Sequence, residues 1–134
     1  MKPPSARLIG GAVLVSILLT GIHFTDNVLS YNEYPTASWI PDWFAVVVGA
    51  SWFAFTAIGI YAYVLYRAGR YDRANVFLLT YSFVGFASLG HFAFGSPSEL
   101  TSFAIVTVMI DAVVGIVVLS VAIWSMRSTR PASV

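Results

Sequence analysis

Four long apolar runs, each about the length that a bilayer requires, constrain the fold of this chain more than any other feature. A helix needs about 20 mostly apolar residues to cross the hydrocarbon core of a membrane. The runs cover about residues 8–28, 43–66, 74–95 and 97–126. They are too long for buried strands, and they lack the alternation of barrel strands. The sequence therefore predicts an all-α integral membrane protein, with a four-helix up-down bundle forming a single transmembrane domain over residues 1–134.

The composition supports a lipid environment. The chain is 58% hydrophobic and only 10% charged, whereas soluble domains contain about 25% charged residues. It has no cysteine, which excludes disulfides, thiolate metal sites and cysteine nucleophiles. Its net charge of +1 gives no indication of a nucleic-acid partner. The first run resembles the apolar part of a signal peptide, but no A-x-A-like cleavage site follows it, so we expect a membrane span instead.

The basic residues all fall at the same predicted end of the bundle. They precede the first run, fill the turn after the second and follow the fourth. The charged residues at the opposite end are all acidic. The positive-inside rule predicts a multi-pass protein of the cell membrane with both termini and the 67–73 loop in the cytoplasm. The 29–42 and 96–102 loops are then external. The basic residues are Lys2, Arg7, Arg67, Arg70, Arg73, Arg127 and Arg130.

The external loops contain two further signals. Ser96 precedes Pro97 and Glu99 in a pattern typical of a capped helix start, which predicts that the fourth helix begins near Pro97. The longer loop is rich in aromatic residues, which favour the boundary between lipid and water. The predicted members of this aromatic belt are Tyr31, Tyr34, Trp39 and Trp43.

Small and polar residues recur at spacings of three and four along every run. In the first run they are Ser16, Thr20, His23 and Asn27, which share one helical face. Membrane helices pack through such residues because lipid supplies no hydrophobic force between helices. We therefore predict that these faces point into the bundle, where most of the Ser, Thr and Gly residues serve packing alone.

Four ionisable residues inside or beside the runs are candidates for function. Asp111 is nearest the bilayer centre, where a charge is costly, so it should face the bundle and find a partner. His23 and His91 lie at similar depth, within about 10 Å of the external boundary. Asp26 lies one turn from His23 and could orient its imidazole ring. The alternatives are a structural hydrogen bond for Asp111, interfacial placement for the histidines and a helix-end role for Asp26.

The favoured hypothesis is a polar site in the outer half of the bundle that binds a small amphipathic or lipid-like ligand. His23, Asp26, His91 and Asp111 are its candidate catalytic residues, because imidazole and carboxylate groups can perform acid–base chemistry. Whether the protein is an enzyme stays open at this stage. The residues expected to line the pocket are Trp52, Thr56, Tyr81, Ser88 and Thr107.

Two alternatives stay open. His23 and His91 could bind a metal ion or clamp one haem, although no HxxxH or HExxH motif occurs. The chain could instead be an accessory subunit, packed in a homo- or hetero-oligomer within the lipid bilayer. No GxSxG motif indicates nucleophilic catalysis, and the sequence does not identify a cofactor.

Overall fold

The computed structural model describes residues 2–94 and 96–129, and the regular structure in these ranges is helical. Four helical stretches are long and apolar enough to cross a membrane, which confirms the predicted class of protein. Residue 95, which is the predicted end of the third helix, and Arg130 lie outside the described residues. The helices are α1 (Ala6–Leu29), α2 (Phe44–Arg67), α3 (Tyr71–Ala87), the short α4 (His91–Phe94) and α5 (Ser102–Thr129).

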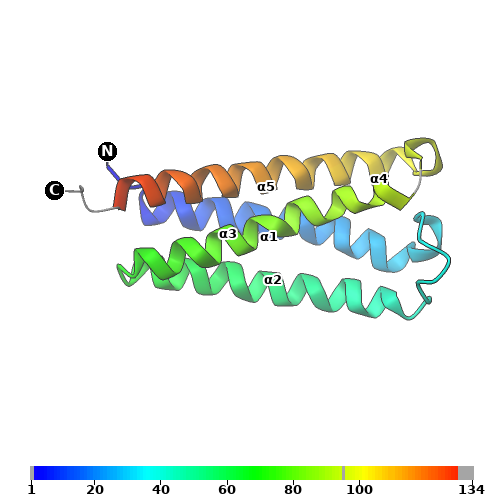
Figure 1. Cartoon of the computed structure of the whole chain (residues 1–134), viewed down its shortest axis with the longest axis horizontal. Helices are drawn as coiled ribbons and strands as arrows, with labels where there is room; N and C mark the ends of the chain where they lie inside the picture. The colour runs from blue at the N-terminus through cyan, green and yellow to red at the C-terminus, as the bar shows by residue number, and fades with distance from the viewer. Residues whose placement is uncertain (1, 95, 130–134) are drawn as a thin grey trace.

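The long helices lie side by side along the long axis of the molecule (Figure 1). α1 packs against α2 and α5, and α3 packs against the same two helices, so α1 and α3 lie on a diagonal. α3 begins beside α2 and ends beside α5. α3 therefore lies closer to α2 at the 68–70 turn than at its other end.

The third span is not one continuous α-helix. It begins at Tyr71, before the predicted start at residue 74, and changes at Ser88–Gly90 into a 3-10 turn before α4. The backbone N–H of Ser88 bonds to the Phe86 carbonyl, which tightens the helix at this point. This irregular turn places His91 on a segment separate from α3.

The fourth span begins later than predicted. Ser96 caps a separate 3-10 turn, Pro97–Glu99, where its side chain accepts a hydrogen bond from the Ser98 N–H. α5 itself begins at Ser102, where the Thr101 hydroxyl oxygen accepts from the Ala104 N–H at 3.1 Å. The prediction that this cap starts the long helix was therefore wrong, because Ser96 caps the separate turn.

The tightest helix contact is between α3 and α5. A Cβ atom at Gly85 would lie 2.7 Å from the Gly115 amide nitrogen and closer still to the Asp111 carbonyl oxygen. A Cβ at Gly115 would lie 3.0 Å from the Ser82 carbonyl oxygen. The absence of side chains at both glycines lets the two backbones touch, as small residues commonly do between membrane helices.

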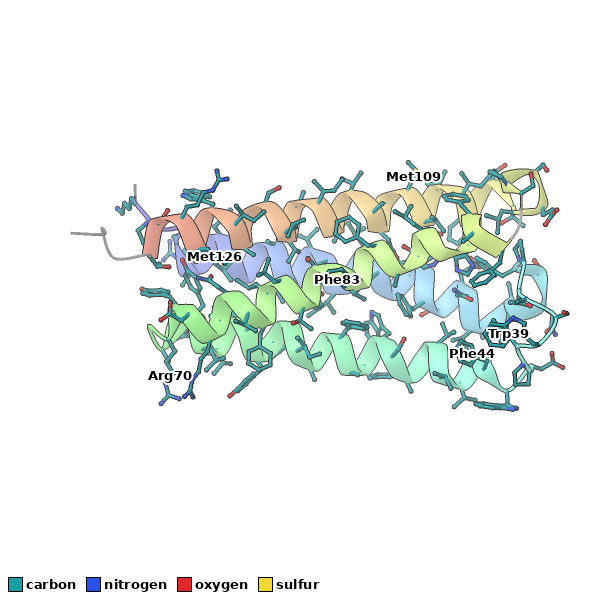
Figure 2. All side chains as sticks on the ribbon, viewed as in Figure 1. Trp39, Phe44, Arg70, Phe83, Met109 and Met126 are labelled. Carbon is teal, nitrogen blue, oxygen red and sulfur yellow. The ribbon has the colours of Figure 1, made fainter. Side chains whose placement is uncertain are left out.

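The aromatic residues of the 30–43 segment divide into two groups. Trp39 and Trp43 are 77% and 65% exposed, as a boundary position requires. Tyr31 and Tyr34 are buried against the bundle, so their assignment to an aromatic belt was wrong. Figure 2 shows Trp39 and Phe44 at the end of the bundle opposite Arg70. The aromatic segment and the basic turn therefore lie at opposite ends of the molecule.

Candidate functional site

A cavity of about 250 Å³ lies at the end of the bundle that carries the 30–43 segment. It is enclosed by α1, that segment, the first half of α2 and the turn between α3 and α4. The third span passes from α2 at its start towards α5 at its end (Figure 1), and the cavity lies between α2 and that far end. Its apolar walls include Phe24, Phe44, Val48, Phe55 and Phe94. The polar residues that line it include His23, Asn27, Ser51, Ser88 and His91.

His23 is the most deeply buried polar residue of the cavity wall, at 1% exposure. Its Nδ1 atom lies 3.1 Å from the hydroxyl oxygen of Thr107 on α5. The same hydroxyl lies 3.0 Å from the Ala104 carbonyl oxygen, which can only accept. When the hydroxyl donates its one hydrogen to Ala104, it accepts from the ring, and Nδ1 then carries the imidazole hydrogen. The other nitrogen, Nε2, is buried without a hydrogen-bond partner.

His91 reaches the same cavity from α4. The side-chain nitrogen of Asn27 lies 2.8 Å from His91 Nε2. Because an amide NH₂ group can only donate, Nε2 accepts and Nδ1 carries the hydrogen of the neutral ring. The His91 and His23 rings meet edge to face, with centroids 5.5 Å apart. Helices far apart in the sequence thus bring the two predicted histidines together.

Tyr34 packs against His91 from the 30–43 segment. Its ring lies 4.6 Å from that of His91, and its hydroxyl donates to the Asp26 carboxylate at 2.5 Å. Burial and this hydrogen bond raise the pKa of the Tyr34 hydroxyl well above its usual value. Asp26 therefore anchors the segment to α1. The prediction that Asp26 orients His23 was wrong, because Thr107 holds the His23 ring instead.

Asp111 faces the bundle as predicted and is 0% exposed. It does not line the cavity, and neither carboxylate oxygen has a hydrogen-bond partner. Ser51, Thr56, Tyr81 and the two histidines do not hydrogen-bond to it. Its own backbone carbonyl lies at the close α3–α5 crossing. The carboxyl group is thus buried in the core, deeper along α5 than the residue that holds His23.

The five residues predicted to line the pocket occupy different places. Ser88 lines the cavity, and Thr107 supports His23 from behind. The Trp52 Nε1–H group donates to the Thr20 hydroxyl oxygen at 3.2 Å. The Trp52 side chain lines two grooves beside α1 that are separate from the cavity. Thr56 borders another groove, shared with Arg7. Tyr81 is enclosed in the core, with its ring against Gly59.

Sequence reasoning missed Asn27 and Tyr34 as parts of the site. Asn27 was placed on the inward face of the first helix, but as a packing residue. Its alignment with His23 one turn away was a usable signal. Nothing local in the sequence indicates that Tyr34 folds back onto His91.

The paired histidines do not fit a haem or a metal ion as arranged. A haem with two axial histidines lies between the rings, whereas these rings are in direct edge-to-face contact. His91 Nε2 is already bonded to Asn27. Within residues 2–94 and 96–129, no group of three or more His, Asp or Glu side chains lies close enough to hold a metal ion.

The fold and site define a multi-pass helical membrane protein with two contacting histidines, of which His23 is buried, beside an end cavity. Comparison with known protein families, curated proteins and solved structures finds no match for this chain. Its function is therefore argued from the site alone.

Proposed function

We propose that this protein binds a small amphipathic molecule from the membrane in the cavity beside His23 and His91. The observation that carries this proposal is the unpartnered Nε2 of His23, buried in the wall of a cavity with aromatic and aliphatic sides. An unpaired polar atom in such surroundings costs about 1–3 kcal/mol, which a ligand that bonds to it recovers. Ligand sites commonly combine mostly apolar walls with a few convergent polar groups.

The cavity limits the size of the group that is bound. Its volume of about 250 Å³ is below the roughly 300–1,000 Å³ of sites that take up whole drug-sized ligands. A polar head and the first part of an apolar chain match this volume. The remainder of a longer ligand then lies among the lipid chains that surround the bundle.

The proposal includes an orientation in the membrane. The basic residues Arg67, Arg70 and Arg73 cluster at the 68–70 turn, at the end opposite Trp39 (Figure 2). The positive-inside rule places this turn and both termini in the cytoplasm, with the helices passing up and down across the cell membrane. The cavity then lies in the outer half of the bilayer, within reach of ligands from the outer leaflet.

Acid–base catalysis is a possible extension of binding at this site. Thr107 fixes the His23 ring, and the free Nε2 is the atom that would take a proton from a bound molecule. Asp111 lies outside the cavity wall, and its carboxylate has no hydrogen bond to either histidine that would give it a part in that step. Binding is the primary proposal because it needs only the groups already in place.

The test is binding of single-chain amphiphiles to the protein in lipid nanodiscs, measured by native mass spectrometry and thermal unfolding. The probes are octanol, heptyl methyl ether, octanoate and octylamine. We expect at least one to bind saturably and to raise the unfolding temperature. If none of the four binds to the wild-type protein, the proposal fails.

A matched pair of variants locates the binding. Ser51 lines the cavity on α2, and Ser120 is exposed on α5; each donates its hydroxyl to a carbonyl of its own helix. Ser51→Leu fills the cavity and should weaken probe binding at least tenfold. Ser120→Leu makes the same chemical change away from the cavity and should leave binding unchanged. Equal binding by the two variants would place the ligand elsewhere.

A further inference from the structure

The cavity contains no charged side chain in its described wall. Its polar members are amide, hydroxyl and imidazole groups, with no Lys, Arg, Asp or Glu. A carboxylate, phosphate or ammonium head would lose its hydration there without meeting an opposite charge, and this is costly in a low-dielectric site. An uncharged head group is therefore favoured. This inference rests on the proposed function, because it concerns the ligand of the same cavity.

The two histidines present complementary hydrogen-bonding atoms. His23 has its hydrogen on Nδ1 when the Thr107 hydroxyl donates to Ala104, and its unpartnered Nε2 is then an acceptor. His91 accepts from Asn27 at Nε2, so its Nδ1 carries the hydrogen and is a donor. The two rings are in contact and both line the cavity. One acceptor and one donor thus stand on adjacent rings.

A hydroxyl group is the simplest head that satisfies both atoms, since it donates one hydrogen and accepts at its oxygen. We propose that the cavity selects a neutral amphiphile with a hydroxyl head, which donates to His23 Nε2 and accepts from His91 Nδ1. The apolar tail packs against Phe44, Val48 and Phe55 on α2. The chemical class is a long-chain or isoprenoid alcohol, and not a fatty acid, amine or phospholipid head.

The first test compares octanol with its isomer heptyl methyl ether in the same nanodisc assay. The two probes have the same atoms, but the ether accepts a hydrogen bond and cannot donate one. We expect octanol to bind about tenfold more tightly, because the ether leaves His23 Nε2 unpaired. Octanoate and octylamine should bind more weakly than octanol. Equal binding of octanol and the ether would overturn the hydroxyl assignment and leave the proposed cavity standing.

Two variants separate the roles of the histidines. His23→Phe keeps a ring but removes the acceptor, so the tenfold preference for octanol should disappear. His91→Phe removes the donor that both probes use, so both should bind more weakly while the preference is kept. A preference that survives in His23→Phe would overturn the assignment of the acceptor.

A second measurement avoids any variant that fails to fold. The chain contains only two histidines, so ¹⁵N-histidine labelling gives two imidazole rings to observe by NMR. We expect both free rings to carry hydrogen on Nδ1. Octanol should shift the Nε2 signal of His23, and heptyl methyl ether should not. The inference would be overturned if octanol binding left this signal unchanged, or if water alone, without octanol, produced the same shift.

Discussion

The contact between Gly85 on α3 and Gly115 on α5 predicts a large effect from a single methyl group. A Cβ at Gly85 would meet the Gly115 nitrogen at 2.7 Å, whereas ordinary contacts begin at 3.4 Å. The two helices would have to separate by at least about 0.7 Å, the difference between these distances. A gap of that size forfeits about a quarter to a half of each van der Waals contact at the crossing.

The expected cost of Gly85→Ala follows from these distances. Overpacking of this kind costs about 1–3 kcal/mol and occasionally more. We expect the upper part of that range, because the clashing atoms at Gly115 and Asp111 belong to the backbone and cannot rotate away. The better helix propensity of alanine offsets about 0.5–1 kcal/mol. The net loss in the free energy of unfolding should be about 2 kcal/mol.

The assay is reversible unfolding in mixed micelles, with increasing denaturing detergent, followed by tryptophan fluorescence. Gly11→Ala is the matched control, because Gly11 lies on the exposed face of α1 with no atom within 4 Å of a Cβ. It should leave stability unchanged or raise it by about 0.5–1 kcal/mol. If Gly85→Ala is as stable as Gly11→Ala, the reasoning about the α3–α5 crossing is refuted.

Three further predictions concern the core, the 30–43 segment and the orientation. Asp111→Asn should raise the free energy of unfolding by about 1 kcal/mol or more in the same assay, because it removes a buried carboxyl group without a partner; a loss of stability would reveal a partner for the carboxylate. Tyr34→Phe should lower the free energy of unfolding by about 1.5–3 kcal/mol and speed hydrogen exchange in residues 31–40, because it removes the bond to Asp26. Unchanged exchange would contradict an anchoring role. Since the fold raises the pKa of Tyr34, its contribution should be complete below pH about 10, the unfolded value, so wild type should lose more stability than Tyr34→Phe as the pH rises above it. In this cysteine-free chain, Trp39→Cys should react with an impermeant thiol reagent added to intact cells and Asp72→Cys should not; the reverse pattern would invert the proposed orientation.

Asp26 and Tyr34 show where reasoning from the sequence stopped. The spacing of Asp26 and His23 on one helix suggested a bond between them, because residues three apart are neighbours on a helix. The structure pairs Asp26 with Tyr34 and His23 with Thr107, across elements whose relative placement no local pattern specifies. The cavity arises similarly, from the turn at Ser88–Gly90 and the crossing of α3 from α2 to α5.

The sequence by itself determined the class of protein, the approximate spans and the inward direction of His23 and Asp111. These properties depend on apolar length and helical periodicity, which are set by residues close together in the chain. Only the tertiary structure decided that His23 meets His91, that Asp111 stands apart from them, and that Asn27 and Tyr34 complete the site. Such pairings depend on where helices cross and how a loop folds back, and both are properties of packing between residues distant in the chain.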